Sequence, residues 1–305
     1  MEMFNYGEPS LYAEGLRFGV ANLVRNGFAL GVKKTIGKVT QPINSYTRFP
    51  EYFFIRKEVE SRTRATANRL KILDVGSPKL LGLILAANNN ADIYLTDITS
   101  LNIDEYKLMW SAIQSKARGS ASFAREDVRQ LTFADNSFDI TYSMSVLEHV
   151  EGDGSDVRGM SELIRVTKPG GMILVTVPFG TSYVEQRRHG IQTAAVRTSK
   201  DQLHFFQRIY TPESAGHLLG SNDELHEIEC QTVWRTNTGI AKTYSALGEN
   251  VRGLLGFLNP LMSQLVNRHS AGIVPQSTCT YGEIFSTRDI YGDLLVTARK
   301  RSAQL

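Results

Sequence analysis

The sequence of 305 residues predicts an α/β protein built on a doubly wound, mainly parallel sheet of seven strands. Three observations support this fold class. From about residue 70, short β-type runs alternate with helical stretches, which is typical of a parallel sheet with helices on both faces. Met172–Val177 is continuously apolar, as expected of a central strand that is buried on both sides. A KPGG turn at 168–171 separates this strand from the helical stretch before it.

The elements follow one another in a regular order. The predicted strands are Lys71–Val75, Asp92–Thr96, Ser122–Arg125, Phe138–Ser143, Met172–Val177, Glu227–Trp234 and Asp293–Ala298. The predicted helices are Pro78–Ala87, Ile103–Lys116, Ser155–Val166 and Thr211–Leu219. Ser77 is a candidate cap for the first of these helices, and Thr211 is a candidate N-cap for the last, before Pro212.

Two stretches interrupt this order and define the expected domain plan. Residues 181–210 follow the carboxyl end of the fifth strand, where sheets of this class bind ligands, and we expect an acceptor-site insertion there. Residues 237–290 form a predicted helical insertion between the last two strands. Residues 1–67 are expected to be an N-terminal helical cap or lid on one large domain, residues 68–305.

Composition excludes several function classes. The content of 42% hydrophobic and 21% charged residues is ordinary for a soluble globular protein. A net charge of +3 is too small to indicate a nucleic-acid partner. Two isolated cysteines form neither a disulfide framework nor a zinc site, and no His or acidic residues have metal-ligand spacing. These features favour a reducing, cytoplasmic location without a metal.

Residues 126–150 hold the most informative motif, EDVRQLTFADNSFDITYSMSVLEHV. Asp127 follows the third strand, and Leu-Glu-His-Val follows the fourth. Together with Asp74 and Gly76 after the first strand, this order over residues 68–180 resembles a class I S-adenosylmethionine-dependent methyltransferase of type 11. The resemblance implies an enzyme with a Rossmann-like sheet whose last strand is antiparallel, and S-adenosylmethionine as its cofactor.

The resemblance also implies which residues bind the cofactor. Asp97 lies 97 − 76 = 21 residues after Gly76, a spacing that suits an acceptor for ribose hydroxyls. Its matching residue in the family binds the adenosyl ribose, and the matches of Asp127 and Val128 contact adenine. The full predicted set is Asp74, Gly76, Ser77, Asp97, Asp127, Val128, Ser143 and Met144.

The residues by themselves leave other interpretations open. Pro78 replaces the second glycine of the family's loop, so this stretch could be a plain strand–turn–helix. The altered loop also keeps open a non-catalytic protein with a methyltransferase fold. It disfavours a nicotinamide oxidoreductase, because a pyrophosphate needs the full G-x-G-x-x-G pattern. Asp97 could be a surface turn residue, and Met144 could simply fill the core.

The candidate catalytic residues are His149 and His189, because methylation of a hydroxyl or an activated carbon usually needs a general base. His149 lies just beyond the fourth strand, where it could instead orient a loop. His189 belongs to the insertion after the fifth strand. The same insertion supplies the predicted substrate-binding residues Tyr183, Arg187, His204 and Phe205, for which a solvated loop is the alternative.

Two apolar stretches bear on the acceptor. Leu11–Val39 mixes apolar and basic residues, which could contact an anionic membrane surface or pack as a cap on the core or on a second copy of the chain. Ala241–Val266 is also amphipathic. We predict methyl transfer to a small-molecule acceptor, such as a natural product, a sugar or a lipid-linked intermediate. O-methylation is the default, C- and N-methylation stay open, and a peripheral-membrane lipid or quinone methyltransferase is the alternative.

Overall fold

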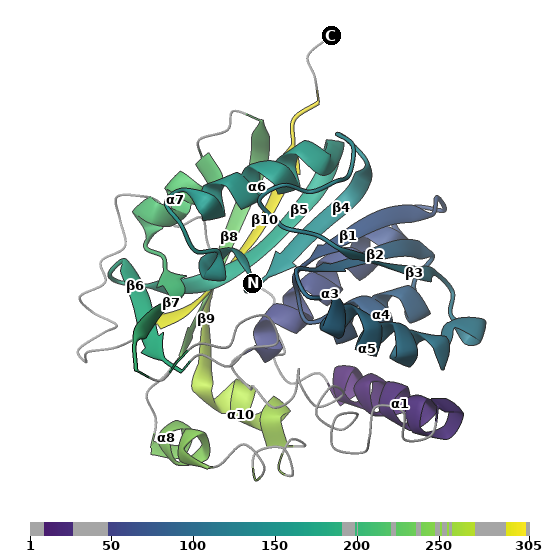
Figure 1. Cartoon of the computed structure of the whole chain (residues 1–305), viewed down its shortest axis with the longest axis horizontal. Helices are drawn as coiled ribbons and strands as arrows, with labels where there is room; N and C mark the ends of the chain where they lie inside the picture. The colour runs from purple at the N-terminus through teal and green to yellow at the C-terminus, as the bar shows by residue number, and fades with distance from the viewer. Residues whose placement is uncertain are drawn as a thin grey trace.

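The structure is a computed structural model that describes residues 9–26, 48–190, 199, 201–220, 224–235, 239–247, 251, 255, 258–271 and 291–302. Its centre is an eight-stranded sheet in the order β3-β2-β1-β4-β5-β10-β8-β9 (Figure 1). Strands β1 to β5 pair in parallel, and β10 is antiparallel to both β5 and β8. The predicted Rossmann-like sheet with its antiparallel last strand is therefore confirmed.

Seven of these strands are the predicted ones, each extended at one or both ends. The eight strands are β1 (Leu70–Val75), β2 (Ala91–Asp97), β3 (Ser120–Arg125), β4 (Phe138–Met144), β5 (Thr167–Gly180), β8 (Leu225–Arg235), β9 (Asn267–Ala271) and β10 (Tyr291–Lys300). Strand β9 was not predicted, because NRHSA has neither an apolar run nor an alternating pattern. It pairs antiparallel with β8 at the edge of the sheet.

Helices cover both faces of the sheet (Figure 1). One face carries α4 (Lys79–Asn88) and α5 (Ser100–Ser111), with α3 (Phe49–Arg64) and α1 (Pro9–Asn26) packed around them. The other face carries α6 (Ser155–Val166) and α7 (Pro212–Gly220). On β1, Ile72 packs into the core on the α4 side and Leu73 into the core on the α6 side. This two-sided burial explains the apolar strands.

The ends of two helices differ from the predicted bounds, and one predicted N-cap is present. The predicted helix Ile103–Lys116 is α5, ending at Ser111, followed by the short 3-10 helix η1 (Gln114–Lys116). Helix α4 begins at Lys79, so Pro78 is its N-cap residue and makes no side-chain cap. At α7, Thr211 and Ser214 cap each other, since each backbone N–H faces the other's hydroxyl, at 2.8 and 3.3 Å. This confirms the predicted N-cap.

The predicted insertions have structure of their own. Residues 181–210 contain the antiparallel hairpin of β6 (Val184–His189) and β7 (Leu203–Ile209). This hairpin packs on η2 (Leu147–His149), the 3-10 turn after β4. The described part of 237–290 contains α8 (Gly239–Ala246), α10 (Asn259–Val266) and β9. Residues 27–39 of the predicted basic, apolar stretch lie outside the described residues.

Candidate active site

The turn after β1 is built around a glycine that no other residue can replace without strain. Gly76 has φ +69°, and its N–H donates to the Thr96 carbonyl at 3.0 Å. A Cβ at this position would lie 2.8 Å from Cγ1 of Val146. Positive φ is unfavourable for side chains other than glycine. The turn thus closes tightly between β1 and the residues that follow β4.

Asp74 lies beneath this turn, and its carboxylate is hydrogen-bonded to three protein groups. Its carboxylate accepts hydrogen bonds from Lys79 Nζ at 2.7 Å, from the Ser77 N–H at 3.1 Å and from the Tyr142 hydroxyl at 2.7 Å. Asp74 and Lys79 are buried. Burial raises the pKa of Asp74, and Lys79 opposes that rise. The contacts show a residue that shapes the loop from below.

Ser77, Ser143 and Met144 connect β1 to β4 under the same loop. Ser77 was predicted to cap α4, but its hydroxyl does not do so. It accepts a hydrogen bond from the Met144 N–H at 2.9 Å instead. The Ser143 hydroxyl donates to the Val75 carbonyl at 3.2 Å. All three side chains are buried. The structure therefore brings these three predicted residues together, buried beneath the turn after β1.

Asp97 lies at the end of β2, on the same edge of the sheet, and is partly exposed. One of its carboxylate oxygens accepts hydrogen bonds from the N–H and the hydroxyl of Thr99, both at 2.9 Å. The other oxygen has a longer contact, 3.3 Å, with the Asn102 amide. This second oxygen retains capacity to accept hydrogen bonds from a ligand.

Asp127 follows β3 and completes the line of predicted residues along the edge. It forms an ion pair with Arg129 at 2.6 Å and accepts the Arg129 N–H at 2.9 Å. These bonds lower the pKa of Asp127, so the side chain is a carboxylate at neutral pH. Val128 is buried beside it and packs near Gly159 of α6.

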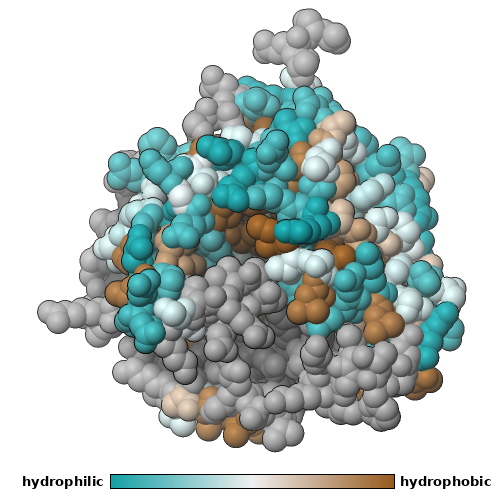
Figure 2. All heavy atoms as spheres, in the orientation of Figure 1, coloured by the Kyte–Doolittle hydropathy of each residue, from teal (hydrophilic) through white to brown (hydrophobic). Residues whose placement is uncertain are grey.

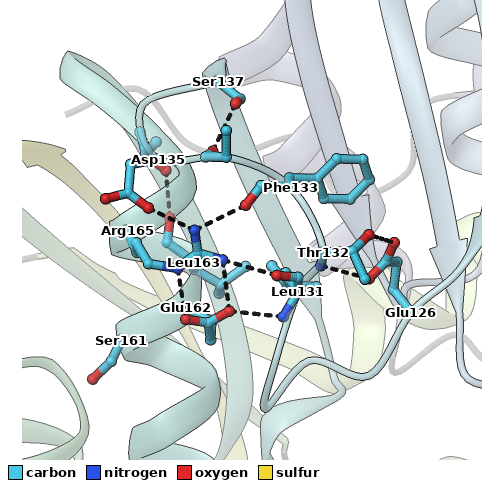
Figure 3. Close-up of polar contacts among 12 residues, drawn as sticks. Glu126, Leu131, Thr132, Phe133, Asp135, Ser137, Ser161, Glu162, Leu163 and Arg165 are labelled. Atoms are coloured by element: carbon cyan, nitrogen blue, oxygen red, sulfur yellow. Dashed lines mark hydrogen bonds and ion pairs between the residues drawn. The ribbon is translucent and has the colours of Figure 1, made fainter.

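The loop that carries Asp127 is fastened to α6 by a polar network (Figure 3). The Arg165 guanidinium donates to the carbonyls of Leu131 and Phe133, at 2.9 and 2.8 Å, and to Asp135 at 2.7 Å. Glu162 pairs with Arg165 and accepts the Leu131 N–H at 2.7 Å. Arg165 therefore holds both ends of residues 131–135 and fixes the position of the loop.

His149 lies in η2, beyond the end of β4, and its ring is oriented by the hairpin. Its Nδ1 lies 2.6 Å from the Phe206 carbonyl oxygen, which can only accept, so Nδ1 carries the proton. Burial lowers the pKa of His149. The ring is therefore neutral at neutral pH, and Nε2 carries the lone pair. Nε2 lies 3.6 Å from Oε1 of Glu148.

The predicted acceptor residues lie on the hairpin in different settings. Tyr183, Arg187 and His189 are exposed, and His189 stands opposite Leu203 at the far end of β6. His204 and Phe205 are half-buried on β7. His204 Nε2 is buried and has no hydrogen-bond partner among the described residues. His204 and Phe205, next to Phe206 on β7, are thus less exposed than His189.

The sequence around this edge of the sheet is similar to that of known proteins. Residues 73–175 match the family model described as a methyltransferase domain. The chain contains a class I methyltransferase domain. Members of this class take S-adenosylmethionine as the methyl donor, as the motif at 126–150 predicted.

Named relatives agree with the domain assignment but match it only in part. A putative methyltransferase of Encephalitozoon cuniculi is 36% identical over 106 residues, which cover 35% of this chain and 49% of that protein. The ubiquinone/menaquinone biosynthesis C-methyltransferase of Bdellovibrio bacteriovorus is 40% identical over 63 residues, 20% of this chain and 26% of that protein. The matched residues therefore span about half or less of the length of these two relatives.

A third relative and one solved structure complete the comparison. The demethylmenaquinone methyltransferase of Renibacterium salmoninarum is 28% identical over 151 residues, 47% of this chain and 58% of that protein. A solved S-adenosylmethionine-dependent methyltransferase from Methanosarcina mazei has a TM-score of 0.47 at 18% identity, over 78% of this chain and 95% of that one. The fold assignment rests on the strand order given above.

The residues of this methyltransferase domain suit the cofactor chemically. Asp97 has an oxygen available for hydroxyl donors, Asp127 is a carboxylate near the end of the neighbouring strand, and Gly76 keeps the turn after β1 narrow. Asp74, Ser77, Ser143 and Met144 support this edge from beneath. Their direct contact with the cofactor stays a prediction. When bound, S-adenosylmethionine supplies an electrophilic methyl group.

Sequence reasoning missed several polar residues of the domain. Lys79 was read as part of a helix start, although its ammonium pairs with Asp74. Glu51, Glu148 and Asp293 are buried at the carboxyl ends of β4 and β5, and no local pattern indicates that these acids are buried. Among the described residues no cluster of metal-ligand type is found. The part of the chain that the structure describes also has no helix long and apolar enough to cross a membrane.

Proposed function

We propose that this chain transfers a methyl group from S-adenosylmethionine to a hydroxyl group of a small-molecule acceptor, with His149 as the general base. The observation that carries this proposal is the orientation of His149. Its Nδ1–H is held by the Phe206 carbonyl, which leaves Nε2 as the basic nitrogen beyond the end of β4. A hydroxyl must lose its proton as the new bond forms, and a placed imidazole contributes about 10²- to 10⁴-fold to such a step.

The hairpin supports the acceptor part of the proposal. β7 presents His204 and Phe205 next to Phe206, the residue that orients His149. The buried Nε2 of His204 lacks a partner among the described residues, and a buried polar atom without a partner is unfavourable. A hydroxylated acceptor can supply the missing hydrogen bond. Tyr183 and Arg187 lie on the exposed part of the insertion, where they suit polar groups at the acceptor's outer end.

The test begins with the cofactor and continues with the acceptor. Calorimetry with S-adenosylmethionine and S-adenosylhomocysteine measures cofactor binding, and transfer of a labelled methyl group is then screened over hydroxyl, amine and activated-carbon compounds. We expect hydroxyl compounds to be labelled, and His149→Gln to lower kcat at least a hundredfold. His217→Gln, an exposed histidine on α7, is the control. Labelling that is unaffected by His149→Gln would contradict the base assignment.

A second candidate places the acceptor at a membrane surface. Relatives of the chain include quinone and sterol methyltransferases, whose named acceptors are largely apolar. The exposed face of α1 is itself apolar and basic, consisting of Ala13, Leu16, Arg17, Val20, Val24 and Arg25. Figure 2 also shows hydrophobic side chains at the lower edge, in the region of α8 and α10. Exposed apolar residues there include Ile240, Leu261 and Leu265.

Vesicles distinguish this second candidate. A basic, apolar helix face binds anionic lipid more strongly than neutral lipid. We expect co-sedimentation with phosphatidylglycerol vesicles, less with phosphatidylcholine vesicles, and loss of binding in Val20→Glu. Leu101→Glu, an equally exposed apolar position on α5 (58% against 59% for Val20), should leave binding unchanged. Equal indifference of all three proteins to vesicles would exclude a membrane-surface acceptor site through α1.

A further inference from the structure

Three acidic side chains from distant parts of the sequence meet at the carboxyl ends of β4 and β5. Glu51 comes from α3, Glu148 from η2 and Asp293 from β10, and each is at most 2% exposed. Asp293 stands opposite Pro178, near the end of β5. Buried carboxyl groups occur almost always with partners. Such a concentration of them at a ligand-binding edge therefore needs an explanation.

Ser145, the residue directly after β4, connects the cluster to the cofactor edge. Its hydroxyl donates to Oε1 of Glu51 at 2.5 Å, and the Thr176 hydroxyl donates to the same oxygen at 2.5 Å. Ser145 has φ +51°, and its N–H donates to the Thr176 carbonyl at 3.0 Å. Ser143 and Met144, just before it, belong to the set of residues predicted to bind the cofactor. Glu51 is thus hydrogen-bonded to the residue that directly follows these two predicted cofactor-binding residues.

Two buried polar atoms in and beside the cluster have no hydrogen-bond partner among the described residues. Arg48, at the start of α3, acts electrostatically on Glu51, Glu148 and Asp293. Oε2 of Glu148 is buried and has no hydrogen-bond partner within the described ranges, and the same holds for the Tyr52 hydroxyl beside Arg48 and Glu51. Leaving a buried polar atom unpaired costs about 1–3 kcal/mol. The cluster is therefore organised to receive a donor or a cation.

We propose that Glu51 and Glu148 form an anionic wall that binds the positively charged methionine part of S-adenosylmethionine. This inference rests on the proposed function, since it places the cofactor at this edge. The shared chemistry is a cation, which is either the sulfonium or the ammonium of the methionine part. Neither residue belongs to the ribose and adenine contacts predicted from sequence. Pairing with the sulfonium would make the wall favour the methyl donor over its demethylated product.

The protonation of the wall gives the proposal a measurable consequence. Burial raises the pKa of Glu51 to about 7 and that of Glu148 to about 8. The groups that face them are Arg48 just before α3, Tyr52 on α3, Asp293 on β10, His149 on η2 and Tyr210 after β7. A bound cation favours the ionised carboxylates. Binding at pH 7 should therefore release protons, and affinity should fall as the pH is lowered from about 8 through 7.

The experiment uses three ligands that carry different sets of cationic groups. S-adenosylmethionine carries sulfonium and ammonium, S-adenosylhomocysteine carries the ammonium, and methylthioadenosine carries neither. Calorimetry at pH 7 in two buffers of different ionisation enthalpy gives the protons released by each. We expect Glu51→Gln and Glu148→Gln each to weaken the charged ligand about tenfold, the effect of one pKa unit, and to leave methylthioadenosine unchanged. Glu58→Gln, on the same helix as Glu51, is the matched control.

The pattern of losses decides the outcome. A loss confined to S-adenosylmethionine assigns the sulfonium, and an equal loss with S-adenosylhomocysteine assigns the ammonium. An equal loss that includes methylthioadenosine would overturn the proposal, because it indicates a structural role. Cofactor binding by the unmodified chain without proton release would also overturn it, whether or not the variants fold. If the unmodified chain binds none of the ligands, the proposed function itself is wrong.

Discussion

The buried pair of Lys79 and Asp74 makes a sharp prediction about the turn after β1. The two side chains are 1% and 0% exposed, and their charged atoms lie 2.7 Å apart. Lys79→Met keeps the apolar stem but leaves Asp74 buried without its cation. Breaking a buried ion pair by removing one partner costs about 3–5 kcal/mol. We expect that loss in the free energy of unfolding, or roughly 6–10 °C in Tm for a chain of this size.

The remaining contacts of Asp74 determine how this loss depends on pH. Without Lys79, its carboxylate keeps only the Ser77 N–H and the Tyr142 hydroxyl, so its pKa should rise above the already raised value. When the pKa of an acid is higher in the folded than in the unfolded state, the free energy of unfolding decreases as the pH rises from the unfolded pKa to the folded pKa. The variant should therefore lie closest to the unmodified protein at acidic pH and furthest from it near neutral pH.

Urea unfolding at several pH values measures the effect, and a double variant controls it. Asp74→Asn together with Lys79→Met removes both charges, so it should recover part of the loss near neutral pH. A loss below about 1 kcal/mol for Lys79→Met, the range of exposed pairs, would refute the reasoning. So would a loss that does not change between acidic and neutral pH.

Three further predictions concern the same edge. Gly76→Ala should lower Tm more than Gly154→Ala, since both have positive φ but only at Gly76 would the added Cβ meet a side chain, that of Val146. Equal shifts in Tm would contradict this, because they would mean that the Val146 side chain moves away at little cost. Asp97→Ala should weaken S-adenosylmethionine binding by about 1–3 kcal/mol in calorimetry, and unchanged affinity in a folded sample would exclude its ribose role. Arg165→Gln should speed amide exchange at Leu131 and weaken cofactor binding, because it frees the loop that carries Asp127; protection equal to that of the unmodified protein would contradict the fastening role.

Much of the fold could be predicted because burial leaves a local signature. Strands covered on both faces are apolar throughout, as Met172–Val177 shows, and turn residues punctuate them. Helix α6 was predicted with its observed bounds because its apolar positions recur with helical spacing. Strand β9 has no such signature, since a polar edge strand is specified mainly by its partner β8.

The polar interior of the site could not be predicted, because its residues come together only in the folded chain. Asp97 and Asp127 stand at strand ends, where topology alone suggests a role. Glu51, by contrast, lies in a helix whose own pattern gives no reason to expect a buried acid. Lys79 could not be predicted to be buried, because a lysine at the start of a helix is usually exposed. Its role emerges only from the closeness of Asp74 in space.

The bonds of Glu51 also bear on how the chain is made. Its partners Ser145 and Thr176 lie 94 and 125 residues further along the sequence. Chains emerge from the ribosome N-terminus first, and contacts between distant residues form late because closing the intervening loop costs entropy. Helix α3 is therefore synthesised long before the strands that it joins. The two hydrogen bonds of Glu51 can therefore form only after Ser145 and Thr176 have been synthesised and β5 has entered the sheet.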